Sequence, residues 1–84
     1  MNSLEQQRDL DETRRLAVMA KVALMANRPI SVDLAGTLVH AMAYHTNLAS
    51  PKWCEAIGKE LLHGNPEIKG HLDTVIEKLN ELLA

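Results

Sequence analysis

The sequence has few of the residues on which several classes of protein depend. It contains no phenylalanine, one tyrosine and one tryptophan, too few for the aromatic platforms that stack on single-stranded nucleic acid. Cys54 is the only cysteine, so no disulfide can form within the chain, and we expect a reducing, cytoplasmic environment. No apolar run approaches the ~20 residues of a membrane-spanning helix. We therefore expect neither a membrane segment nor a signal peptide.

The distribution of charge argues against nucleic acid as the main partner. The net charge is −2, and every arginine lies in the first third of the chain. Such a chain lacks the broad cationic surface that dominates affinity for DNA or RNA. A helix-turn-helix pattern can be drawn over residues 39–56, but its second helix would begin at Ser50-Pro51 and carry Glu55 beside Lys52. Weak DNA binding is therefore only a second alternative.

The spacing of apolar residues predicts an all-α domain with four helices and no strand. Ser31 and Ser50 are placed to cap two of the helices, and Gly64 is placed to end the third. The connections are short, which favours antiparallel neighbours and a compact bundle spanning residues 1–84 as one domain. The predicted helices cover, approximately, residues 4–26, 32–46, 51–63 and 66–83.

Two signals compete for the start of the first helix. Ser3 and Gln6 can form a capping box, and so can Asp9 and Glu12. The second choice would leave residues 1–8 as a frayed arm. We predict one long helix with a loose first turn or two.

Each of the later helices has one apolar stripe. In the second helix the stripe is Ala35, Leu38, Val39 and Met42, and in the third it is Trp53, Ile57 and Leu61. The fourth helix carries a seam of alternating spacings of four and three, made of Ile68, Leu72, Val75, Leu79 and Leu82.

Residues 16–26 differ, because Lys21 is their only polar side chain and apolar atoms face every direction around the helix. The other three helices of so small a domain can cover only one side of this segment. We therefore predict that a second copy of the chain or another protein covers the opposite side. The residues of this association face are Val18, Met19, Val22 and Met25, and the self-contact uses either Val18, Val22 and Met25 or the opposite line of Met19 and Ala23.

A row of cations also lies on the first helix. Arg14, Lys21 and Arg28 are spaced seven apart and therefore share one stripe. This basic stripe has two interpretations. It holds an anionic partner, such as a nucleotide phosphate, or it is a solvated edge in which the arginines pair with nearby acids.

Histidine and cysteine do not have the spacing of a recognised metal site. His40 and His45 are five residues apart, whereas helical zinc ligands usually lie four apart. We predict no metal and no cofactor. Together with Tyr44, these two histidines form a polar cluster opposite the core stripe of the second helix, which is either a contact surface or simply exposed.

Nothing in the sequence predicts catalysis. Cys54 adjoins Trp53 on a face that we expect to be buried, and no base is positioned to activate its thiol. Asp9, Asp11 and Glu12 lie in a capping region, and the glycines form no phosphate-binding loop. We predict that the protein is not an enzyme.

Two likenesses are consistent with this interpretation. The apolar pattern from Leu16 to about Leu62, which includes Leu38-Val39-His40, is similar to that of small, helical, dimeric enterobacterial two-component connector proteins. In size and composition the chain resembles small phage-encoded inhibitors. We predict a homodimeric regulator, adaptor or inhibitor that binds an unidentified protein stoichiometrically, with an anionic-ligand or nucleotide binder as the alternative.

Overall fold

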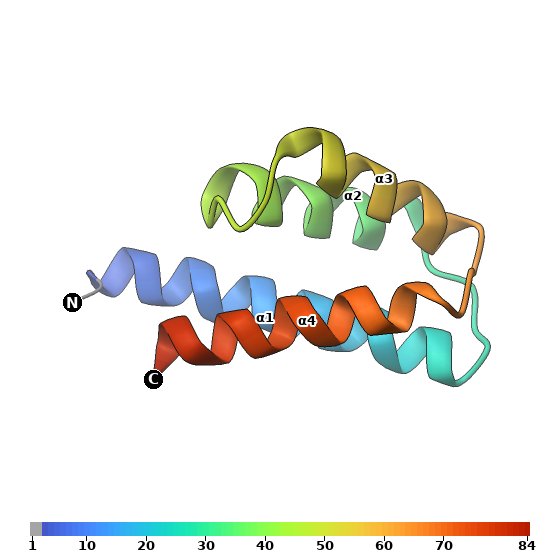
Figure 1. Ribbon diagram of the computed structural model, residues 1–84, viewed down its shortest axis with the longest axis horizontal. Coiled ribbons are helices and arrows are strands. Elements are labelled where there is room, and N and C mark those ends of the chain that lie inside the picture. The colour runs from blue at the N-terminus through green and yellow to red at the C-terminus, as the bar shows by residue number, and fades with distance from the viewer. Residues whose placement is uncertain (1–2) are drawn as a thin grey trace.

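The computed structural model describes residues 3–84 and confirms a small all-α bundle. The predicted second helix is divided, because its last turn is π-helical and is labelled η1. The helical segments are α1 (Leu4–Met25), α2 (Val32–His40), η1 (Ala41–His45), α3 (Pro51–Leu62) and α4 (Ile68–Leu83) (Figure 1).

Of the two predicted start signals, the capping box of Ser3 and Gln6 is the one that begins α1. The Ser3 hydroxyl accepts a hydrogen bond from the Gln6 amide at 3.1 Å, and the Gln6 side chain accepts one from the Ser3 amide at 2.9 Å. This capping box satisfies two backbone donors that the helix itself leaves unpaired. The helix therefore begins at Leu4, and residues 4–8 are its first turns, not an arm that precedes a helix starting at Asp9. Residues 1 and 2 of the alternative arm lie outside the described residues.

The other predicted helix ends are largely confirmed. Ser31 accepts from the Leu34 amide, and Ser50 accepts from the Trp53 amide. Gly64 adopts a left-handed conformation with a φ of 69°. Two asparagines adopt the same conformation in the other connections, Asn27 with a φ of 55° and Asn47 with a φ of 50°. Asparagine tolerates this region better than most residues do.

The start of α4 differs from the prediction by two residues. Pro66 and Glu67 form a turn, and regular helix begins at Ile68. The side chain of Asn65 accepts a hydrogen bond from the Glu67 amide at 3.1 Å and donates one to Glu60 at 2.8 Å. Asn65 thus joins the end of α3 to the turn before α4.

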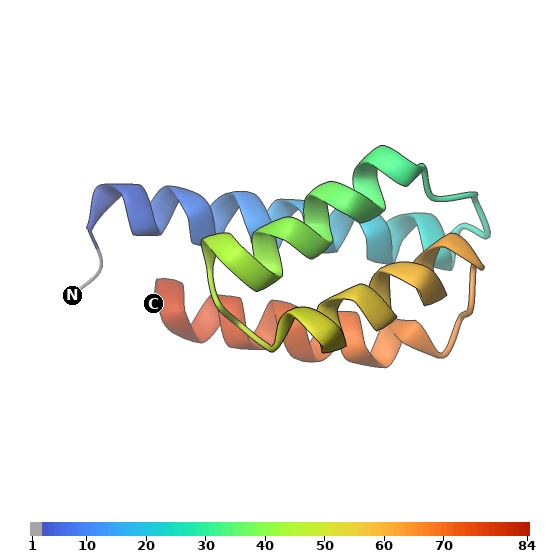
Figure 2. The ribbon, with the colours of Figure 1, turned by 90° about the horizontal axis from the view of Figure 1, so that it is seen from above.

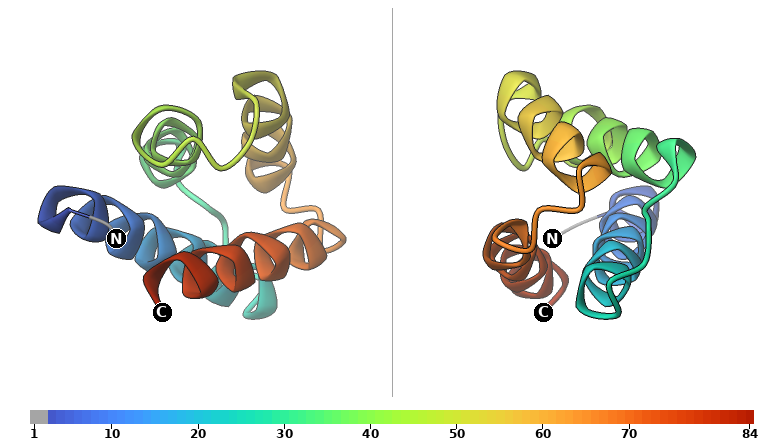
Figure 3. Two further views of the ribbon diagram at one scale, coloured as in Figure 1. Left: turned by 60° about the vertical axis from the view of Figure 1, so that its left-hand side comes forward. Right: turned by 90° about the vertical axis from the view of Figure 1, so that its right-hand side faces the viewer.

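The helices form two antiparallel pairs. α1 packs chiefly against α4, and α2 with η1 packs chiefly against α3. Figures 1 and 2 show the α2 and α3 pair lying over the α1 and α4 pair. The end-on view in Figure 3 shows the four helices arranged around a common centre.

Most of the predicted core is buried at this centre. Val39 and Trp53 are only partly buried, and Leu82 keeps 42% of its surface exposed. The α2 and α3 backbones approach closely at Gly58, where an added Cβ would lie 2.6 Å from Cγ2 of Val39. The fully buried large side chains are Leu38, Met42, Leu61, Leu72 and Leu79.

None of the helices in residues 3–84 has both the length and the apolar character needed to cross a membrane.

Candidate functional site

The predicted association face lies on the outside of the bundle. Its four side chains keep 41% (Val18), 48% (Met19), 58% (Val22) and 64% (Met25) of their surfaces exposed. The opposite face of the same segment, with Leu16, Ala17 and Ala20, is buried. Helix geometry places residues three and four apart on one side, so the four exposed side chains form one patch over two turns.

In the alternative line through Met19 and Ala23, only Met19 is exposed. Ala23 is partly buried and packs against the core, and Met19 faces outward with the other members of the association face. The exposed surface therefore combines Val18, Val22 and Met25 with Met19, and Ala23 contributes little to it.

A shallow groove between α1 and α4 adjoins this patch. It has a volume of about 500 Å³ and shares Val18 and Met19 with the association face. Ile76 contributes apolar surface from α4, while Arg15 belongs to the α1 side. The remaining lining residues are Asp11, Arg14 and Asn80. The groove was not anticipated, because no local signal indicates which residues of α4 lie beside α1.

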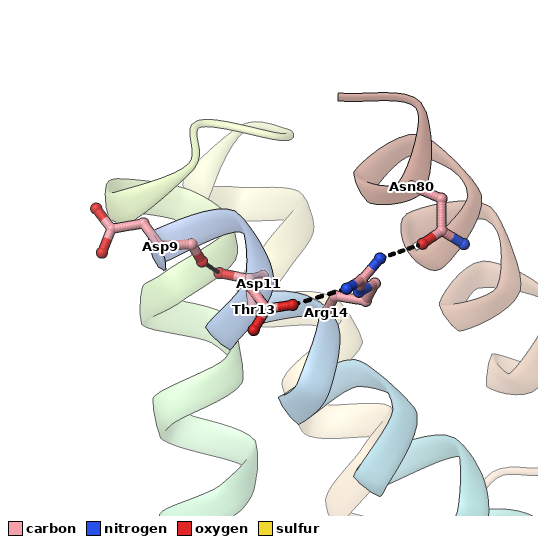
Figure 4. Close-up of polar contacts among 5 residues, drawn as sticks. All are labelled: Asp9, Asp11, Thr13, Arg14 and Asn80. Atoms are coloured by element: carbon pink, nitrogen blue, oxygen red, sulfur yellow. Dashed lines mark hydrogen bonds and ion pairs between the residues drawn. The ribbon is translucent and has the colours of Figure 1, made fainter. Parts of the chain in front are cut away.

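The first cation of the basic stripe is held by neighbouring side chains. The guanidinium of Arg14 donates to Asp11 and to Asn80, both at 2.7 Å. Figure 4 shows Arg14 reaching from α1 towards Asn80 on α4. Asn80 lies 66 residues away in sequence, so this contact links the first helix to the last.

The second cation of the stripe is also bound by α4. Nζ of Lys21 lies 2.6 Å from Oδ1 of Asp73, whose other oxygen is 3.6 Å from Nζ of Lys69. The hydrogen bond from Lys21 is the main cause that lowers the pKa of Asp73 below its ordinary value, and Lys69 adds to it. Arg28 is exposed in the connection after α1. Two of the three cations of the stripe, Arg14 and Lys21, are therefore already bound by side chains of the same chain.

The polar cluster on the second helix is brought together more closely than its sequence spacing indicates. The ring centroids of His40 and Tyr44 are 5.1 Å apart, and those of His40 and His45 are 4.9 Å apart. The π-helical turn lies between the two histidines. Nothing in the sequence predicted it.

Cys54 is buried, as predicted. Burial is the main cause that raises the pKa of its thiol above the ordinary value, and the nearest polar contact is the Ala49 carbonyl at 3.9 Å. A raised pKa leaves little thiolate for nucleophilic attack. Within residues 3–84, no group of three or more His, Cys, Asp or Glu side chains is arranged to hold a metal ion.

No protein-family model, no curated protein and no solved structure matches this chain.

Proposed function

We propose that this protein is a small cytoplasmic interaction module that regulates another protein by stoichiometric contact, and that a second copy of itself covers the same face when that protein is not bound. The observation that supports the proposal is the association face. Four large apolar side chains form one continuous patch on the outside of α1. Contiguous exposed apolar surface of this kind is typical of protein interfaces. Methionine suits a surface that adapts to its partner.

The energetics indicate that the association face is an anchor rather than a whole interface. Complete burial of a Val or Met side chain contributes about 1.5–3 kcal/mol. Each of these four is about half exposed, so covering them yields roughly 1 kcal/mol apiece. A micromolar complex needs about 8 kcal/mol net of the cost of association. The partner must therefore also contact the neighbouring groove, where Ile76 and Arg15 extend the surface.

The anionic-ligand alternative has less support. Arg14 and Lys21, which would hold the anion, are bound by Asn80 and Asp73 of α4. A ligand would have to replace these contacts. The DNA-binding alternative still lacks a cationic surface.

Affinity capture from a lysate of the source cell tests the proposal. Val22→Glu places a charge at the centre of the association face. Val32→Glu is the matched control, because Val32 is 73% exposed and lies on α2, outside the face. We expect a partner that is captured in equal proportion by the wild type and the control and is lost with Val22→Glu. Capture of the same partner by Val22→Glu would contradict the proposal.

Light scattering coupled to size-exclusion chromatography tests the self-association. We expect a dimer of the wild type and of Val32→Glu at tens of micromolar, and a monomer of Val22→Glu. A strictly monomeric wild type would remove the homodimer from the proposal.

A further inference from the structure

The π-helical turn η1 places two histidines side by side. In a regular α-helix, residues five apart are displaced by about 140° around the axis, so their side chains diverge. In a π-helical turn the hydrogen bonds join residues five apart, as in the 3.0 Å bond from the Thr46 amide to the Ala41 carbonyl. Residues five apart then lie roughly one turn from each other. This turn puts His40 and His45 on the same side, with ring centroids 4.9 Å apart.

This separation fits two imidazoles that share one metal ion. A zinc–nitrogen bond of about 2.0–2.1 Å, plus about 1.2 Å from the nitrogen to the ring centre, puts the metal about 3.2 Å from each centroid. At a tetrahedral angle the two centroids would be about 5.2 Å apart. The observed 4.9 Å is close to this value.

Both rings are available for binding. His40 and His45 are exposed, and within residues 3–84 neither ring makes a hydrogen bond or an ion pair. The ring planes are at 89° to each other. Rotation about χ2, which nothing in the described chain restrains by a polar contact, can turn a nitrogen of each ring towards a common point.

The surroundings favour a cation. The two histidines line one cleft of about 420 Å³ between α1 and α2. They flank the C-terminal end of a helix, where the helix dipole favours positive charge. Glu12 lines the same cleft, but both of its carboxylate oxygens are 2.7 Å from Nη2 of Arg15. We therefore assign Glu12 no role as a ligand.

We propose that His40 and His45 form a two-histidine site for a divalent transition-metal ion such as Ni²⁺ or Zn²⁺. Imidazole nitrogen is a favourable ligand for both ions. Water completes the coordination, since no third protein ligand is arranged beside the pair within residues 3–84. The site lies where α2 ends and η1 begins and does not involve the association face of α1.

Isothermal titration calorimetry of the untagged protein with NiCl₂ and with ZnCl₂ tests the site. We expect one ion per chain. We expect His40→Ala and His45→Ala each to weaken binding by at least about tenfold, since even a partner that only orients a metal ligand contributes that much. His63→Ala is the matched control, because His63 is exposed at the end of α3, and it should bind as the wild type does. No binding by the wild type, or unchanged binding by His40→Ala and His45→Ala, would overturn the proposal.

A second measurement needs no variant. Substoichiometric Ni²⁺ should broaden the imidazole NMR signals of His40 and His45 before those of His63 and His71. His71 packs edge-on against Trp53, with centroids 5.9 Å apart, and serves as an internal reference. Equal broadening of all four histidines, or earlier broadening of His63 or His71, would show that the pair is not the site.

Discussion

Lys21 is the only polar side chain of residues 16–26, and its ammonium group is bound by a carboxylate of the last helix. A position that looked available to an anionic partner is therefore part of the contact between α1 and α4. Arg14 likewise joins α1 to α4, through its hydrogen bond to Asn80 nearer the C-terminal end of α4. At the scale of single residues, the basic stripe joins two helices, and the apolar side chains beside it remain exposed.

Removal of the Asp73 carboxylate should change how stability depends on pH. Because the pKa of Asp73 is lowered in the folded protein, its ionised form stabilises the fold above the ordinary pKa, and this contribution is lost as the pH falls through the folded-state value. In urea titrations, the wild type should exceed Asp73→Asn in free energy of unfolding at neutral pH, and the difference should shrink as the pH falls below the ordinary pKa of Asp, about 3.9.

Glu77→Gln is the control for this experiment, because Glu77 is exposed on the same helix and makes no ion pair within residues 3–84. Its curve should run parallel to that of the wild type. Parallel curves for wild type and Asp73→Asn would contradict the assigned role of Asp73.

Cys54 should react with thiol reagents only when the bundle opens. The side chain has no exposed surface, and burial raises the pKa of its thiol. We expect labelling of the native protein to be at least about 100-fold slower than labelling in denaturant, since reaction requires local or global opening. The rate of reaction with a chromogenic disulfide measures this, and comparable rates in both conditions would be evidence against a buried thiol.

At the scale of elements, the close approach of α2 and α3 depends on the absence of a side chain at Gly58. A Cβ there would meet Cγ2 of Val39 at 2.6 Å. The β-branched side chain of Val39 has essentially one rotamer in a helix and cannot easily move away. The helical period assigns Val39 to the core stripe but does not connect it with Gly58, because their contact depends on how the two helices cross.

Gly58→Ala should therefore destabilise the protein, although alanine is the better helix former. Overpacking costs about 1–3 kcal/mol, while the gain in helix propensity is at most about 1 kcal/mol. Gly36→Ala is the control in α2, where no atom other than the adjacent residues and the helix's own backbone lies within 4 Å of the added Cβ, and it should stabilise by about 0.5–1 kcal/mol. Chemical denaturation measures both changes.

The same experiment can be extended by adding Val39→Ala to Gly58→Ala. If the clash is the cause, the double variant should be more stable than the sum of the two single effects predicts. If the two effects on the free energy of unfolding are additive, the clash with Val39 is not the cause of the destabilisation by Gly58→Ala.

At the scale of the whole molecule, the two helix pairs cover each other and leave the outer side of α1 uncovered. Its exposed apolar side chains are confined to the C-terminal half, from Val18 to Met25, apart from Leu4 at the other end. Homodimerisation through this half would make the stability of the fold depend on protein concentration, because only the folded chain associates.

The melting temperature should therefore rise with protein concentration in the wild type and in Val32→Glu, and should be independent of concentration in Val22→Glu. Differential scanning calorimetry over a hundredfold range of concentration measures this. Melting temperatures that do not vary in any of the three proteins would be inconsistent with the proposed dimer.

The sequence by itself determined the helices, most of their ends and most of the core. Caps such as Ser3, Ser31 and Ser50 act within a few residues, and the helical period alone assigns apolar side chains to one face. Local information also singled out residues 16–26 as a segment with more apolar surface than its own bundle can bury.

Only the tertiary structure decided which side of α1 faces outward, which groups bind Arg14 and Lys21, and how His40 meets His45. The first two depend on α4, which lies far along the chain. The third depends on the π-helical turn, which changes the angle between residues five apart and which no residue of the segment specifies. The contacts of Arg14 and Lys21 arise when distant segments pack, whereas the contact of the two histidines arises from a local change in helix geometry, and regular helical spacing along the chain reveals neither.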